Sequence, residues 1–218
     1  WIDSFSSVVI VYKQRFEKEK KIMSAFLAPI HFWMYDKILI AQKLTFAVEE
    51  KFLNKEERDE AESLFPALIS EDLEEVIDQS NIHGWLHTAV SNVEIRFAYV
   101  IKKLLDKGIS LEDIKKVAFE YGTTFPKYEI SSLQDAYELL MDILLDGLPC
   151  DVSISVIREE ENELEFVLYN DIHKQYFNEF DMEASVYHEL REAFVNGLFE
   201  KYSLKYKNII DSNKLISR

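Results

Sequence analysis

Glycine, proline and cysteine are scarce in this sequence. Its 218 residues include 5 glycines, 4 prolines and a single cysteine, Cys150. Glycine and proline are the strongest local breaks in secondary structure, so their scarcity predicts long helices. One cysteine cannot form a disulfide within the chain, which indicates a reducing compartment. We therefore expect a cytoplasmic protein in which Cys150 is a buried structural residue rather than a nucleophile.

Long hydrophobic runs are missing as well. The most apolar segment, residues 30–40, contains His31, Asp36 and Lys37. A helix that crosses a bilayer needs roughly 20 consecutive apolar residues. The sequence therefore predicts no membrane span.

Basic residues are outnumbered by acidic ones. The chain has 25 Lys and Arg against 40 Asp and Glu, a formal net charge of −15. Such a charge repels phosphate backbones, so direct binding to nucleic acid is not expected. The densest basic run, residues 13–21, is interleaved with Glu17 and Glu19, which is typical of a solvated helix face.

What the sequence does contain is a succession of helical patterns. Apolar residues recur at helical spacing, and caps and breaks delimit the segments, among them Asn54, Ser70, Gly108, Ser110 and Gly122. Gly122 is expected to end the helix that precedes it. The predicted helices cover residues 1–26, 30–53, 55–65, 71–79, 85–105, 111–121, 131–146 and 183–201.

A two-residue period replaces the helical one near the C-terminus. Residues 151–157 and 163–169 alternate apolar and polar side chains on either side of a polar turn, which predicts a β-hairpin, and residues 204–210 read as a further strand. The expected fold class is α+β, mostly helical with a small antiparallel sheet near the C-terminus. We divide it into a helical N-terminal region for dimerisation or partner contact, residues 1–80, and an α+β ligand-binding-like domain, residues 81–218.

Three motifs follow one another in the C-terminal half. They are residues 117–122 (VAFEYG), residues 147–152 (GLPCDV) leading into 164–170 (LEFVLYN), and residues 194–199 (FVNGLF) followed by 204–209 (LKYKNI). This succession resembles the ligand-binding superfamily that unites vinyl-reductase-like sensory domains with the subunits of the TRAPP vesicle-tethering complex. The resemblance implies a domain that binds a ligand or joins an assembly. Sensory members often carry metal-binding cysteines after the third strand, where this chain has none, so metal binding of that kind is not expected.

Two side-chain patterns have the spacing of a metal or catalytic site. His83 and His87 share a helix face with Glu94, which is compatible with a metal site or with two partly exposed histidines. Glu192 and Asn196 are spaced as in histidine-kinase-type ATPases, but no glycine-rich loop follows to enclose a nucleotide, so a polar helix face is the simpler interpretation. We predict no catalytic residue, no metal and no cofactor.

Aromatic residues are abundant, with 15 phenylalanines and 11 tyrosines. Those of the C-terminal half form either an ordinary aromatic core or the wall of an apolar pocket with a few hydroxyl groups to orient a ligand. The candidate ligand-binding residues are Phe119, Tyr121, Phe125, Tyr128, Tyr137, Phe166, Phe194 and Phe199.

These observations favour a non-enzymatic sensory or regulatory module. It would bind a small apolar or aromatic ligand and signal through its N-terminal helices, which would contact a second copy or a partner protein. The alternative is a structural subunit of a protein assembly, as in TRAPP, with an apolar contact surface around Phe32, Trp33 and Phe46.

A further alternative is a haemless globin-like sensor. Residues 87–144 have a globin-like succession of helices and carry Tyr121 and Gly122 where globins often have a similar pair. The position of the proximal haem ligand would be Ala118, which cannot bind iron.

Overall fold

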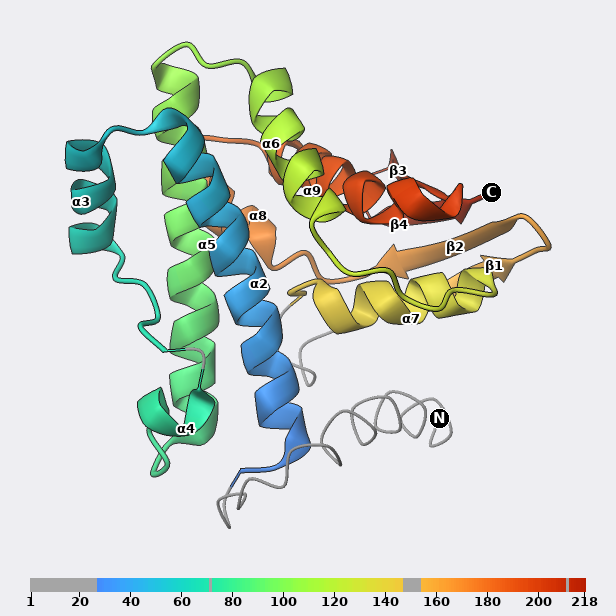
Figure 1. The fold of residues 1–218 in the computed structure, drawn as a ribbon, viewed down its shortest axis with the longest axis horizontal. Coiled ribbons are helices and arrows are strands. Elements are labelled where there is room, and N and C mark those ends of the chain that lie inside the picture. Colours follow the sequence, from blue (N-terminus) through green and yellow to red (C-terminus); the bar gives the residue numbers. More distant parts are fainter. Residues whose placement is uncertain (1–26, 71, 147–153, 211) are drawn as a thin grey trace.

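The computed structural model describes residues 27–70, 72–146, 154–210 and 212–218. The predicted helix over residues 1–26 and Cys150 lie outside these residues. The predicted fold class, mostly helical α+β with a small antiparallel sheet near the C-terminus, is confirmed. The elements follow one another as α2 (Pro29–Phe52), α3 (Lys55–Leu64), α4 (Leu73–Val76), α5 (Ile82–Asp106), α6 (Leu111–Thr123), α7 (Leu133–Ile143), β1 (Ile154–Glu159), β2 (Glu163–Leu168), α8 (His173–Asn178), α9 (Ala184–Phe199), the 3-10 turn η1 (Glu200–Tyr202), β3 (Lys205–Ile210) and β4 (Asn213–Ser217) (Figure 1).

The strands form one antiparallel sheet in the order β1-β2-β4-β3. Leu164 of β2 lies opposite Ile216 of β4, which lies opposite Tyr206 of β3. These buried side chains and Phe166 share one hydrophobic core with residues of α7 and α9. The predicted hairpin and the strand after α9 are confirmed, whereas β4 was not predicted, because its short polar sequence has no clear alternation. A globin is built from helices, so the sheet counts against the haemless-globin alternative.

Two glycines bring α6 and α9 into backbone contact. A Cβ atom added to Gly122 would lie 2.2 Å from the carbonyl oxygen of Phe194, and one added to Gly197 would lie 2.0 Å from that of Phe119. Neither position can hold a side chain unless a helix moves. The prediction that Gly122 ends its helix is wrong, because α6 continues to Thr123. The glycine permits close packing instead.

Helices α2 and α5 lie side by side and connect the two halves of the fold (Figure 1). Ile38 of α2 shares a core with Val90 and Val93 of α5. Further along α2, Ile40 and Leu44 pack against the core that α6, α7, α9 and the sheet enclose. Helix α2 therefore contacts both the helical and the sheet-containing part of the molecule.

Two short helices differ from the prediction. In place of a helix over residues 71–79, α4 has a single turn, and its N-cap is Asp72, whose side chain accepts a hydrogen bond from the backbone N–H of Glu74. The apolar residues that reach the core from the described part of this segment, Leu73, Val76 and Ile77, all lie in or next to this turn, so apolar contacts support no longer helix. Helix α8 was not predicted, because its 6 residues are too few to show a period. None of the described helices is long and apolar enough to cross a membrane.

Candidate functional site

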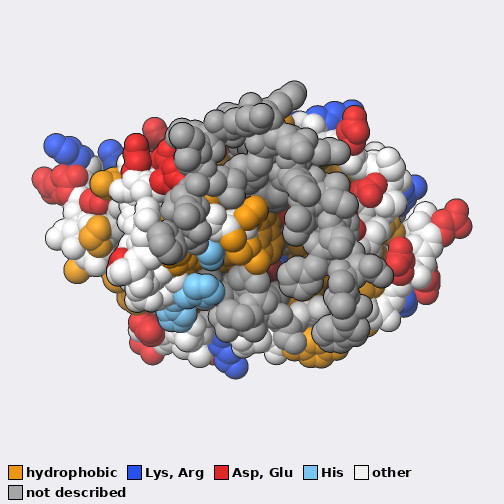
Figure 2. Space-filling model, turned by 90° about the horizontal axis from the view of Figure 1, so that it is seen from below, with side chains coloured by type: hydrophobic (Ala, Val, Ile, Leu, Met, Phe, Trp, Pro, Cys, Tyr) orange, Lys and Arg blue, Asp and Glu red, His pale blue; other side chains and the backbone are white. Residues whose placement is uncertain are grey.

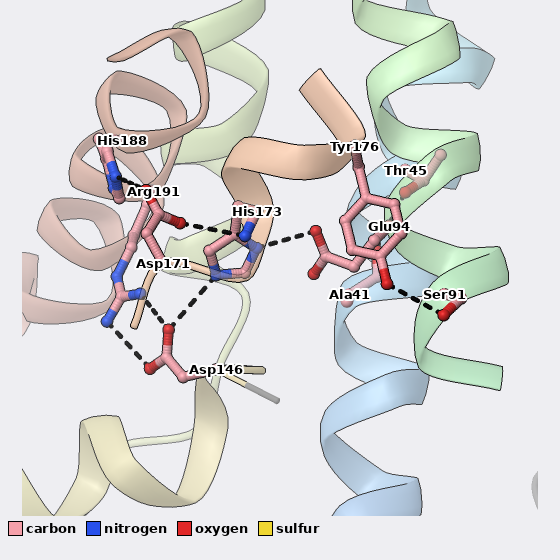
Figure 3. Close-up of polar contacts among 10 residues, drawn as sticks. All are labelled: Ala41, Thr45, Ser91, Glu94, Asp146, Asp171, His173, Tyr176, His188 and Arg191. Atoms are coloured by element: carbon pink, nitrogen blue, oxygen red, sulfur yellow. Dashed lines mark hydrogen bonds and ion pairs between the residues drawn. The ribbon is translucent and has the colours of Figure 1, made fainter. Parts of the chain in front are cut away.

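Four charged side chains from separate parts of the chain meet in the interior (Figure 3). Glu94 comes from α5, His173 begins α8, Arg191 lies on α9, and Asp146 follows α7. Their exposed fractions lie between 0% and 4%. Charged side chains are almost never this buried unless they are paired. These four residues are called the ion network below.

The members of the ion network are joined by direct hydrogen bonds. His173 Nδ1 lies 2.8 Å from Glu94 Oε2, and His173 Nε2 lies 3.4 Å from Asp146 Oδ1. Arg191 donates two parallel bonds to Asp146, from Nη1 to Oδ1 and from Nη2 to Oδ2, the second at 3.2 Å. Such a bidentate pair fixes the relative orientation of both groups. The network thus ties α5, α8, α9 and the end of α7 together.

Neighbouring residues hold the imidazole of His173 in place. Asp171 Oδ1 accepts a hydrogen bond from the backbone N–H of His173 at 3.0 Å, which satisfies a free donor at the start of α8. The ring of Tyr187 stacks on the imidazole, with 3.6 Å between ring centroids and 15° between ring planes. Stacking and the two carboxylates leave the imidazole a single orientation.

The network stabilises the charged forms of His173, Asp146 and Arg191. Burial lowers the pKa of His173, but the carboxylates of Glu94 and Asp146 outweigh it and raise this pKa to about 9. Burial raises the pKa of Asp146, but Arg191 and His173 hold it well below its usual range. At neutral pH we therefore treat His173 as an imidazolium between two carboxylates.

A second, partly buried pair lies beside the network. His188 Nε2 is 2.8 Å from Asp171 Oδ2, and His188 Nδ1 is 3.4 Å from Lys214 Nζ. Burial lowers the pKa of His188 despite the neighbouring carboxylate. The pKa of Asp171 falls to about 2, because His188 and His173 outweigh the effect of burial. His188 is therefore neutral at neutral pH, whereas His173 is charged.

Aromatic rings lead from the surface to the ion network. The rings of Tyr137 and Phe166 are 5.1 Å apart, and those of Phe166 and Tyr206 are 6.4 Å apart. Burial raises the pKa of Tyr206 to about 12, and the charge of Arg191 opposes that rise. Neither the Tyr206 hydroxyl nor Arg191 Nε makes a hydrogen bond of ordinary geometry with the described residues. The polar end of this aromatic row therefore has unused hydrogen-bonding capacity.

The candidate ligand-binding residues fall into several groups. Tyr121, Phe125 and Phe194 contact one another, with ring centroids 5.4 to 5.6 Å apart, while Tyr137 and Phe166 form the pair described above. Ligand binding by these residues stays a prediction. Two further candidates belong to the core around the sheet: Phe199 is fully buried in it, and the half-buried Tyr128 packs against it. Phe119 lies apart from this core, in a shallow depression on the outer face of α6.

His83 and His87 of the predicted histidine pattern are exposed on α5. Histidine side chains gather beside apolar ones on the face seen from below (Figure 2). His31 and His83 contact each other edge to face, with ring centroids 5.7 Å apart. Glu94, the third residue of the predicted pattern, is bonded to His173 instead. Among the residues that the structure describes, no three His, Cys, Asp or Glu side chains are placed to hold a metal ion.

Glu192 and Asn196, which have the ATPase-like spacing, form hydrogen bonds with a strand of the sheet. Asn196 accepts a hydrogen bond from the backbone N–H of Tyr206 and donates one to its carbonyl oxygen, at 3.0 and 2.9 Å. Glu192 accepts a bond from the backbone N–H of Asn208 at 2.8 Å. Both side chains therefore attach β3 to α9, which accounts for their spacing without a nucleotide.

Sequence reasoning missed the ion network as a site. Its members come from distant segments, so no local spacing unites them. One signal was present, because Glu94 interrupts the apolar stripe of Val90, Val93 and Phe97, and Arg191 lies between buried Leu190 and Phe194. A charge inside an apolar stripe indicates a buried partner.

Comparison with protein-family models, with curated proteins and with solved structures found no match to this chain. The resemblance to the vinyl-reductase-like and TRAPP superfamily therefore stays a prediction.

Proposed function

We propose that this chain is a non-enzymatic regulatory module that binds a small apolar or aromatic ligand beside the ion network and passes the change to α2 and α5. The observation that carries the proposal is the course of the network. It runs from Arg191 on the sheet side through Asp146 and His173 to Glu94 on α5. A ligand that shifts one end changes the hydrogen bonds along the whole path.

The aromatic row is the proposed place of the ligand. Tyr137 is half-buried, and the carboxylate of Asp146 raises its pKa in addition to the larger effect of burial. A molecule that displaced the Tyr137 ring would contact Phe166 and approach Asp146. Apolar walls with a few polar groups at one end are the usual composition of a small-molecule site.

The state of His173 supports a role other than catalysis. A general acid or base must come within hydrogen-bond distance of its substrate. His173 is 0% exposed, and both ring nitrogens are engaged by carboxylates. A charged group held in this way is suited to linking elements rather than to proton transfer with a substrate.

Thermal unfolding with a panel of phenols, fatty acids and tetrapyrroles tests ligand binding. A ligand present at 100 times its Kd stabilises the native state by about 2.7 kcal/mol. For a chain of this length, that corresponds to a rise in Tm of roughly 5–10 °C. No rise with any member of the panel would contradict the proposal.

Hydrogen exchange tests transmission once a binding ligand is found. Bound ligand should slow amide exchange in α2 and α5 of the native chain. The effect should be lost in a variant that replaces the buried pair by apolar residues, Arg191→Met with Asp146→Leu. The matched control is Lys116→Met with Asp113→Leu, which removes an ion pair on the surface of α6. Equal protection in all three proteins would show that the network carries no signal.

One observation favours the second candidate, a structural subunit of an assembly. Val156 and Ile157 on β1, an edge strand of the described sheet, and Tyr169 just after β2 are 37%, 49% and 62% exposed. An open strand edge with apolar side chains is a common site for pairing with another chain. Light scattering of the native chain and of Ile157→Lys tests this candidate. It predicts a multimer that the substitution disperses.

A further inference from the structure

Lys37 is a buried lysine whose ammonium has no hydrogen-bond acceptor among the residues that the structure describes. It lies on α2, is 5% exposed, and its Nζ atom is 3.7 Å from the ring centroid of Trp33, one turn earlier. Over residues 27–70, 72–146, 154–210 and 212–218, no oxygen accepts a hydrogen bond from it and no carboxylate forms an ion pair with it. Buried ammonium groups are normally paired. Apart from the face of Trp33, the ammonium of Lys37 therefore has no partner among the described residues.

The surroundings of Lys37 combine an aromatic face with charges that do not touch it. The indole N–H of Trp33 donates to Asp142 Oδ1 at 3.0 Å, which holds this carboxylate toward α2. Burial lowers the pKa of Lys37 to about 8, and Arg191 adds to this effect, while Asp146 and Asp142 oppose it. Trp33 and Asp142 are only half-buried, so the site lies near the molecular surface.

The balance of charge selects the class of ligand. Carboxylates already outnumber cations in this region, because Glu94, Asp142, Asp146 and Asp171 surround Lys37, His173 and Arg191. An anionic ligand would add to this excess of negative charge in a buried place, which is costly. A neutral molecule with an oxygen acceptor would supply the missing hydrogen bond and leave the balance unchanged.

We propose that Lys37 holds a small neutral aldehyde or ketone as a Schiff base against Trp33. This inference rests on the proposed function and names the chemical class of its ligand. It places the carbonyl group of that ligand at Lys37, which interacts with the same Asp146 carboxylate as Tyr137 of the aromatic row. The ammonium first releases a proton to water, and the neutral amine attacks the carbonyl carbon to form the C–N bond. The resulting carbinolamine takes up a proton and loses water. In sum, ammonium and carbonyl compound give iminium and one water, so the positive charge opposite Asp142 is preserved.

The environment of Lys37 also favours reaction with a carbonyl group. Only the neutral amine is a nucleophile, and a lowered pKa increases its share. With a pKa of about 8 against roughly 10.4 for an exposed lysine, Lys37 has about 200 times more neutral amine at pH 7. Its labelling should therefore exceed that of surface lysines.

Reductive trapping tests the inference. The full chain is incubated with benzaldehyde and sodium cyanoborohydride, and peptide mass spectrometry locates the benzyl group. We expect labelling at Lys37 to exceed that at Lys51, an exposed residue of the same helix, by about tenfold or more. The labelling rate of Lys37 should rise with pH and level off above about pH 8. Lys37→Arg should lose this label, and Lys51→Met should keep it.

Other results would overturn the inference. Equal labelling of Lys37 and Lys51 would show that Lys37 is an ordinary amine. Benzyl alcohol, which has the same ring but no carbonyl group, separates this failure from that of the proposed function. If it raises the Tm while benzaldehyde gives no adduct at Lys37, carbonyl binding is refuted and ligand binding stands. If benzaldehyde does not label the chain and neither compound raises its Tm, carbonyl binding is refuted, and so is the proposal that the ligand is aromatic.

Discussion

The charge of His173 predicts a loss of stability from pH 6.5 to pH 8. The folded chain holds its proton up to a pKa of about 9, whereas an unfolded histidine releases it near 6.5. A group with a raised folded-state pKa stabilises fully below its unfolded pKa, and this stabilisation is lost as the pH rises. While only the folded state binds the proton, the free energy of unfolding falls by about 1.4 kcal/mol per pH unit. From pH 6.5 to 8 the loss is about 2 kcal/mol.

The titration of other groups limits the pH range over which this loss of stability is observed. The pKa of Lys37 is lowered to about 8, so above pH 8 the unfolded chain binds the extra proton and stability rises with pH. This rise cancels the fall due to His173 between pH 8 and 9, where we expect a plateau. His188, with its lowered pKa, makes stability rise with pH only below about 6.5.

Urea unfolding at pH 6.5, 7, 7.5 and 8 checks the prediction, with His173→Gln as the comparison. Glutamine keeps hydrogen-bonding groups but takes up no proton, so the variant should show no fall in this window. Parallel curves for the two proteins would refute the reasoning. Should the variant not fold, an NMR titration of the His173 ring in the native chain decides the matter. A midpoint near 6.5 in place of about 9 would contradict the charged network.

Three further predictions concern stability and are measured by urea unfolding. Gly122→Ala should destabilise the chain by about 1–3 kcal/mol, because the added Cβ meets the backbone of α9. This loss is expected although alanine favours a helix over glycine. The control, Gly84→Ala, should cost less stability, because the atoms nearest to its added Cβ belong to a movable side chain. Arg191→Met should cost about 3–5 kcal/mol, since it leaves Asp146 buried without its bidentate partner, and adding Asp146→Leu should recover part of this loss. Asn196→Ala should cost about 1–3 kcal/mol, because two backbone groups of β3 lose their partner.

Local patterns predicted much of the fold. Asn54 and Ser110 cap α3 and α6 as expected, through side-chain oxygens that accept backbone N–H groups. Gly108 ends α5 with a positive φ of 81°, a conformation that glycine adopts without strain. These signals act over a few residues, so a single sequence contains them in full.

Gly122 shows where local reasoning fails. A glycine near the end of a helical pattern fits both a C-cap and a close helix contact, and only the position of α9 decides between them. The same holds for the ion network. The partners of His173 lie 79 and 27 residues away along the chain, and no spacing rule reaches that far.

Native mass spectrometry of the chain, after incubation with phenols and aromatic aldehydes, tests the central claim most directly. The claim is that a small ligand binds beside the buried ion network. Under gentle conditions the account predicts an added small-molecule mass that is lost on denaturation, and for aldehydes a mass that borohydride reduction fixes at Lys37. A chain that carries no added mass with any compound would contradict the claim.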